Sequence, residues 1–180
     1  MNKTIENNNK TTITMRAIIL TLIFTSISLG LFSQDFEVPK DYKLDKAEDY
    51  AAYEADVINC FDWLMETPLN EQKAKRKEAN AFLFVWLSGS PNVQIELKQD
   101  VVTFAGTSPD LMLIFMGGWA KYSLESQDFT DKVAANLAGI ESVIEFYKAN
   151  RKVMSKDKNV EKYIKMKDKG TLDEYIRENA

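Results

Sequence analysis

The chain of 180 residues contains no histidine and a single cysteine, Cys60. Without histidine it cannot form the serine–histidine or cysteine–histidine pairs of many hydrolases, and it has no imidazole to bind a metal. One cysteine excludes an internal disulfide and a thiolate metal cluster. These absences favour a protein that is not an enzyme, and we expect no catalytic residue, no metal site and no cofactor.

Glycine and proline are also scarce, at seven and four residues. Sandwiches and barrels need frequent turn residues between their short strands, so this scarcity disfavours both. The content of 45% hydrophobic and 28% charged residues is ordinary for a globular protein. We therefore predict an all-α fold, a compact bundle of six or seven helices, with solenoid-like helical hairpins as one possible arrangement.

The N-terminal sequence has the layout of a secretory signal peptide. Arg16 precedes sixteen mainly apolar residues, 17–32, and small residues and the polar stretch SQDFE come next. A membrane-spanning helix needs about 20 mainly apolar residues, so an uncleaved anchor is the less favoured alternative. Cleavage after Gly30 or Ser33 would release an exported protein, periplasmic or secreted, without stable membrane insertion. The true start is either the first methionine or Met15.

The signal peptide would cover residues 1–33, followed by an extended lead-in over 34–44 and a single helical domain over 45–180. Residues 1–34 hold three basic residues and one acidic residue, so their loss changes the net charge from −4 to −6. An acidic protein is a poor match for nucleic acid and for anionic membrane surfaces, which attract basic proteins. We expect a protein partner in the cell envelope and no nucleic acid.

Apolar residues recur every three or four positions along most of the chain, which predicts helices. The apolar run 81–87 is hydrophobic on all sides and is expected at the centre of the core. Residues 93–105 fit a strand or a helix, and we predict a helix because no second strand is evident to pair with it. Ser108 or Thr107 is expected to cap the helix that starts at Pro109. The other long helices are predicted over residues 45–66, 68–88 and 129–151.

Further signals mark helix ends. Thr67 is expected to cap the helix that starts at Pro68. Near the C-terminus, Gly170 is expected to end a helix. The sequence TLDE, residues 171–174, is expected to form a capping box that opens the last short helix.

The glycines Gly117 and Gly118 lie next to each other within an apolar helical stretch. Each costs a helix about 1 kcal/mol relative to alanine, so some interaction should offset the pair. A close approach by the small residues between positions 134 and 139 is the favoured explanation. The alternative is a ligand-binding cleft over the two glycines. Its candidate residues are Gly117, Gly118, Trp119, Lys121, Tyr122 and Glu125.

The segment 148–169 is strongly basic, with nine lysine or arginine residues and three acidic ones. The solvated face of a terminal helix explains such a run most simply. The alternative is a docking patch for an acidic partner. Its candidate residues are Lys148, Arg151, Lys152, Lys162 and Lys165.

Two stretches, FLFVWLSGSPNV and LMLIFMGGWAKYSLE, follow an N-terminal region that ends in FSQ. This combination, in a chain rich in lysine, asparagine and aspartate, resembles small exported helical proteins of Bacteroidota-type bacteria that have no assigned function. The resemblance implies export and a helical fold, and it carries over no catalytic residue.

We expect an exported, non-enzymatic helical module that binds a protein partner. Grooves between helices bind peptides through aromatic anchors, and the candidates here are Trp63, Trp86 and Trp119. One alternative is a small-ligand carrier or a carboxylate-based enzyme that uses Glu141 and Glu145, which lie on one helix face. Another is a structural subunit of an envelope assembly.

Overall fold

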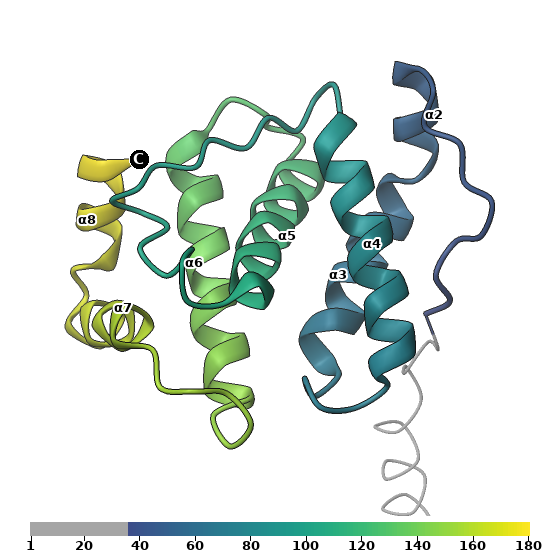
Figure 1. Cartoon of the computed structure of the whole chain (residues 1–180). Coiled ribbons are helices and arrows are strands. Elements are labelled where there is room, and N and C mark those ends of the chain that lie inside the picture. Colours follow the sequence, from purple (N-terminus) through teal and green to yellow (C-terminus); the bar gives the residue numbers. More distant parts are fainter. Residues whose placement is uncertain (1–35) are drawn as a thin grey trace, which may run out of the picture. The chain divides into compact units, whose positions relative to one another are not determined.

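Seven helices and no strand make up the part of the chain that the structure describes, residues 36–180 (Figure 1). The structure is a computed structural model. Residues Phe36–Ala180 form one compact unit, and their secondary structure confirms the all-α prediction. The predicted signal peptide, residues 1–33, lies outside the described residues.

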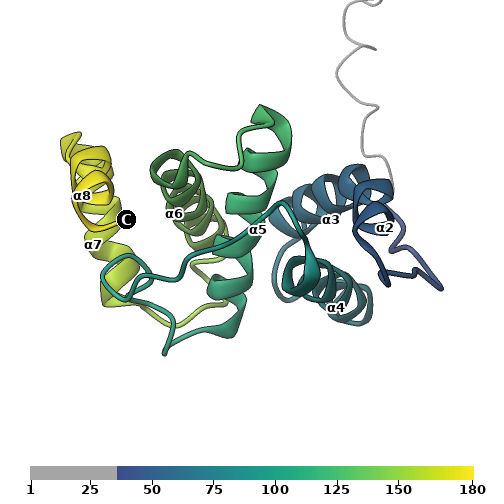
Figure 2. The same ribbon diagram turned by 90° about the horizontal axis from the view of Figure 1, so that it is seen from above.

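In chain order the helices are α2 (Ala47–Ala52), α3 (Glu54–Glu66), α4 (Lys73–Gly89), α5 (Pro109–Ser126), α6 (Lys132–Ala149), α7 (Lys158–Lys169) and α8 (Leu172–Asn179). The α5–α6 pair lies in the middle, with α3 and α4 on one side of it and α7 and α8 on the other (Figures 1 and 2). The fold is therefore a row of helical pairs, and buried apolar side chains from every pair form its core.

Several helix boundaries differ from the sequence prediction. The helix expected over 45–66 is broken at Tyr53, whose backbone (φ −108°, ψ 7°) separates α2 from α3. α4 starts at Lys73, later than predicted, because Gln72 just before it takes the left-handed conformation (φ 42°). Thr67, predicted to cap the next helix, instead ends α3.

The apolar half of α4 is only partly buried. Phe82 and Trp86 lie in the core, and the indole N–H of Trp86 donates to the Tyr50 carbonyl (3.0 Å). Phe84 and Val85, by contrast, are 57% and 44% exposed. The prediction that the whole run lies at the centre of the core is therefore wrong. α4 packs against α3 and α5 and presents these two side chains to solvent.

Residues 93–105 form neither the predicted helix nor a strand. They run as an irregular connection with turns between α4 and α5, although Val101 within it is fully buried. Some carbonyls of this connection accept from backbone N–H groups within its own turns, and others accept from side chains of the C-terminal helices. The hydroxyl of Tyr163 donates to the Val101 carbonyl (2.8 Å), and that of Tyr175 donates to the Asp100 carbonyl (2.8 Å).

The side chains that hold this connection are suited to donating hydrogen bonds. Burial raises the pKa of Tyr163 to about 12, so its hydroxyl stays protonated at neutral pH. The side-chain amide of Asn159 donates to the Thr103 carbonyl (2.7 Å). Local periodicity does not reveal such partners, because they lie 56 and 62 positions further along the chain.

Other boundaries agree with the sequence prediction. Ser108 caps α5 through its side chain, and Pro109 is the first helical residue. Gly170 ends α7 in the left-handed conformation (φ 69°), which glycine adopts without strain. The capping box predicted over residues 171–174 is not formed, since Thr171 makes no side-chain hydrogen bond to the start of α8.

Candidate functional site

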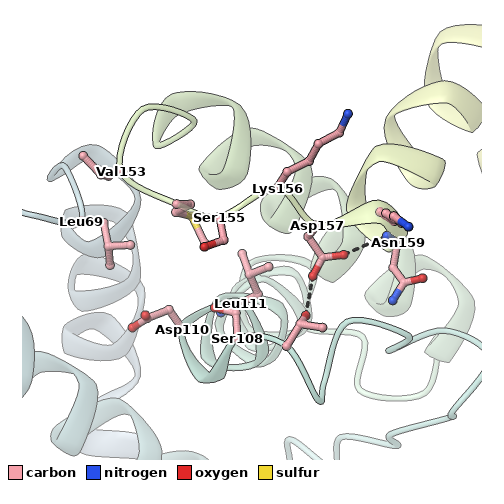
Figure 3. A pocket seen from close by; sticks show the side chains of 12 residues that line it. Leu69, Ser108, Asp110, Leu111, Val153, Ser155, Lys156, Asp157 and Asn159 are labelled. Atoms are coloured by element: carbon pink, nitrogen blue, oxygen red, sulfur yellow. Dashed lines mark hydrogen bonds between the residues drawn. The ribbon is translucent and has the colours of Figure 1, made fainter.

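A cleft of about 550 Å³ opens where α5 and α7 begin (Figure 3). We call it the α5–α7 cleft. It is lined by the turn between α3 and α4, the start of α5, and the connection that leads from α6 into α7. Its volume falls in the range of ligand-binding pockets. The lining residues are Leu69, Thr107, Ser108, Asp110, Leu111 and residues 153–159.

The apolar part of the cleft is formed by Leu69, Leu111, Val153 and Met154. Leu111 is fully buried in α5, whereas Val153 is 48% exposed. Leu69 is held in place because its backbone N–H donates to the side-chain oxygen of Asn150 (2.7 Å), just after α6. An apolar side chain of a ligand would therefore meet a preformed surface.

Asp157 organises the polar wall of the cleft. It is the N-cap of α7, and its carboxylate accepts from the backbone N–H groups of Asn159 (2.8 Å) and Val160 (3.2 Å). Its other oxygen accepts from the hydroxyl of Thr107, just before α5 (Figure 3). The backbone N–H of Asp157 donates to the hydroxyl of Tyr147 on α6 (3.0 Å). One aspartate thus joins the starts of two helices to a third helix.

Part of the cleft wall has backbone groups that make no hydrogen bond to other backbone groups of the described residues. Ser155 and Lys156 belong to no helix or turn, and they have no backbone hydrogen-bond partner among the described residues. Unpaired N–H and C=O groups of this kind can pair with an extended peptide, as in β-strand addition. The Lys156 side chain points away from Leu111 and Ser108, so it does not fill the cleft (Figure 3).

Arg76 is a buried cation on α4 that holds the turn between α3 and α4. Its guanidinium donates to the carbonyls of Leu64 (3.2 Å) and Thr67, where the negative end of the α3 dipole lies. Burial lowers the pKa of Arg76, and the charge of Asp110 in the cleft partly offsets this effect. Arg76 thereby fixes the turn that brings Leu69 to the cleft.

The surface beside the cleft is positively charged. The cleft itself is balanced, because its charged lining consists of Lys156, Lys158, Asp110 and Asp157. Three predicted docking residues, Lys148, Lys152 and Lys165, are exposed and form no ion pair within residues 36–180. Lys148 and Lys152 come just before the cleft wall in the chain, whereas Lys165 lies further along, on α7.

The other two predicted docking residues have partners within the chain. Arg151 pairs with Glu161 (2.5 Å), and its guanidinium lies over the ring of Tyr147 (5.0 Å). The ammonium of Lys162 lies over the ring of Tyr175 (4.9 Å). Arg151 thus also stabilises the wall of the cleft, because Tyr147 bonds to both Glu161 and the residue that caps α7.

Gly117 and Gly118 face two different helices. A Cβ on Gly117 would collide with the Phe61 ring of α3, and one on Gly118 would collide with a side chain of α6. From the opposite side, a Cβ on Gly139 would lie 2.7 Å from the Phe115 ring and 2.8 Å from the Phe115 carbonyl. α5 thus approaches α3 and α6 closely. The predicted approach by small residues of α6 applies to Gly118, whereas Gly117 packs against α3.

The remaining candidate ligand residues are divided between the interior and the surface of α5. Trp119 is buried, and Tyr122 packs half-buried against the core. Lys121 pairs with Asp62 (2.5 Å) and with Glu125 (3.5 Å). Burial lowers the pKa of Lys121, but the two carboxylates outweigh this effect and the net shift is upward. None of the six candidate residues lines the α5–α7 cleft.

The three tryptophans considered as partner anchors, Trp63, Trp86 and Trp119, are all buried. An anchor must be accessible in the free protein, so these side chains serve the core instead. Within the described part of the chain, the exposed large apolar side chains are Phe84, Val85, Leu97 and Val153.

Cys60 is fully buried, and its thiol donates to the Ala79 carbonyl across the α3–α4 contact (3.4 Å). Burial, with a smaller contribution from Asp56, raises the pKa of the thiol to about 12.

We expect the native protein to resist a thiol-specific disulfide reagent at about pH 8, because the thiolate is the reactive form. After unfolding in guanidinium chloride the thiol should react fully. Rapid labelling of the native protein would show instead that the α3–α4 contact opens.

The carboxylates considered for a small-ligand or enzyme site are separated by their surroundings. Glu141 pairs with Lys167 (2.7 Å), whereas Glu145 is exposed.

Among residues 36–180 no three acidic or cysteine side chains come together in a way that could hold a metal ion. In the same residues, none of the helices has the length and apolar character required to cross a membrane.

Comparisons with protein-family models, with curated proteins and with solved structures find no match to this chain. A function is therefore proposed from the geometry and chemistry of the described residues.

Proposed function

We propose that the protein is an exported, non-enzymatic interaction module that binds an extended segment of a protein partner in the α5–α7 cleft. The observation that carries the proposal is the unpaired backbone of Ser155 and Lys156 beside a preformed apolar surface. The N-terminal sequence supports export to the periplasm or beyond, which would place the partner in the cell envelope.

The cleft defines the chemistry of the segment that would bind. An apolar side chain would pack against Leu69 and Val153, while the main chain pairs with residues 155–156. Acidic residues next to this anchor would meet Lys148 and Lys152, which have no ion pair among the described residues. We therefore expect an extended segment with one apolar anchor and acidic neighbours.

Selection of random peptides displayed on phage tests this proposal. The enriched peptides should share an aliphatic or aromatic residue flanked by aspartate or glutamate. Ser155→Pro removes a backbone N–H of the wall and should weaken binding of an enriched peptide roughly tenfold or more. Ser155→Ala keeps this N–H and is the matched control, which should bind like the unaltered protein.

A second variant tests the charge. Lys152→Glu should slow association of an acidic peptide and weaken its binding several-fold, with the effect shrinking at high salt. Circular dichroism establishes that each variant is folded. The proposal fails if selection yields no common sequence, or if Ser155→Pro and Ser155→Ala bind the selected peptide equally well.

A further inference from the structure

Helix α7 carries a stripe of four exposed lysines, Lys158, Lys162, Lys165 and Lys169. Successive spacings of four, three and four residues place them on one face of the helix. None of them forms an ion pair within the described chain. The lysine stripe therefore presents four positive charges that the carboxylates of residues 36–180 do not neutralise.

The opposite side of the molecule carries the opposite charge. Residues 45–56, which cover α2 and the first turn of α3, contain five acidic residues and one lysine. Asp45 and Glu48 are exposed, and Glu54 and Asp56 are half-buried. None of these four carboxylates forms an ion pair with another described residue. Both views place α2 and α7 on opposite sides of the α5–α6 pair (Figures 1 and 2).

We propose that copies of this chain associate head to tail, with the lysine stripe of one copy against the acidic surface 45–56 of the next. The stripe carries four positive charges, and the acidic surface has a net charge of −4. The stripe extends over eleven residue steps of one helix, roughly 16 Å at 1.5 Å per residue, and the acidic surface extends over the same number of residues across the break at Tyr53. Because the two surfaces differ and lie on opposite sides, each contact leaves a free surface at both ends, and the association continues until the rotation between successive copies closes a ring.

A second copy fits the lysine stripe better than a lipid surface does. Helices that lie on membranes expose apolar side chains that enter the lipid. The apolar residues of α7 are instead buried or half-buried against the protein, namely Val160, Tyr163, Ile164 and Met166. Every copy of the chain carries both surfaces, so the acidic surface is always present at the same concentration as the lysine stripe.

Sedimentation velocity tests the proposal. The sample is the protein purified from its own cells, with the N-terminus that the cell leaves on it. At about 20 mM NaCl the average sedimentation coefficient should rise as the protein is concentrated from a few micromolar to several hundred micromolar. At about 300 mM NaCl it should stay constant, because salt screens exposed charges over distances of a few ångströms. A coefficient that does not rise with concentration at low salt would overturn the proposal.

Charge reversal makes the test specific to these two surfaces. The stripe variant is Lys162→Glu, Lys165→Glu and Lys169→Glu. The acidic-surface variant is Asp45→Lys, Glu48→Lys and Glu54→Lys. Each variant alone should remain monomeric at low salt, and their equimolar mixture should associate again, because each then presents the charge that the other lacks. A mixture that stays monomeric, or a single variant that associates like the unaltered chain, would overturn the proposal.

This inference does not rest on the α5–α7 cleft. The stripe variant leaves Ser155 and Lys156 unaltered and, compared at about 300 mM NaCl where the exposed charges are screened, should keep its affinity for a selected peptide. Ser155→Pro, in turn, should keep the salt-dependent association. Failure of one proposal is therefore distinguishable from failure of the other.

Discussion

Gly139→Leu should lower the free energy of unfolding by about 3 kcal/mol or more. The new Cβ alone would lie 2.7 Å from the Phe115 ring and 2.8 Å from the Phe115 carbonyl. A backbone oxygen within a helix moves only if the helix moves, so α5 and α6 would have to separate. Denaturation with urea, followed by circular dichroism, measures the loss.

Gly106→Leu is the matched control for this prediction. A Cβ at Gly106 meets nothing within 4 Å and the backbone there is not left-handed, so its stability change should stay below about 0.5 kcal/mol. Gly139→Ala adds a finer test, because helix propensity alone predicts a gain of about 1 kcal/mol. A loss in this variant would isolate the cost of the crowded contact. An unaffected Gly139→Leu would show that α5 and α6 do not approach this closely.

Asp157→Ala should cost about 2–4 kcal/mol of stability. The substitution removes the acceptor for two N–H groups at the start of α7 and for the hydroxyl of Thr107. These interactions fasten the connection after α6 to the start of α5, so the wall of the α5–α7 cleft should loosen as well. Urea denaturation measures the stability, and hydrogen exchange over residues 153–160 reports the wall.

Asp157→Asn separates the hydrogen bonds from the charge. Asparagine caps helices about as well as aspartate, and its amide N–H can donate to the hydroxyl oxygen of Thr107, whose hydrogen then goes to the Phe104 carbonyl (2.7 Å). Its cost should therefore stay near 1 kcal/mol or below. Equal losses in the alanine and asparagine variants would mean that the negative charge, and not the capping geometry, stabilises this junction.

The fold class was predictable because its signals are local. Ser108 and Pro109 mark a helix start through groups within one turn, and Gly170 marks an end through its own backbone conformation. The small residues on α6 also pointed to the close contact with Gly118, since glycine within a helix needs a compensating interaction, but they did not reveal that Gly117 packs against Phe61 of α3. These inferences needed no knowledge of distant parts of the chain.

The failures share a different cause. Residues 93–105 contain enough apolar side chains for a helix, but their carbonyls bond to Tyr163 and Tyr175, far along the chain. The sequence of the apolar run in α4 shows that it is hydrophobic, but not which of its sides packs against α3 and α5. For this reason the prediction wrongly placed Phe84 and Val85 in the core. In both cases tertiary contacts decide the outcome, and local periodicity carries no information about them.

The α5–α7 cleft was missed for the same reason. A cap for α5 was evident in the sequence at Ser108, but the meeting of this helix start with that of α7 depends on Asp157 reaching Thr107. The basic composition of segment 148–169 is evident in the sequence. Only the structure shows which basic residues of this segment form ion pairs within residues 36–180, as Arg151 does, and which do not, as with Lys152.

The tyrosine bonds to the connection between α4 and α5 also govern how the chain can fold as it emerges with its N-terminus first. The connection emerges long before Tyr163 and Tyr175, so until these residues emerge the carbonyls of Asp100 and Val101 lack the partners they have in the fold. The middle of the molecule is thus completed by its last helices. Because Asp157 and α7 belong to the same late segment, the cleft would take shape in the same final step.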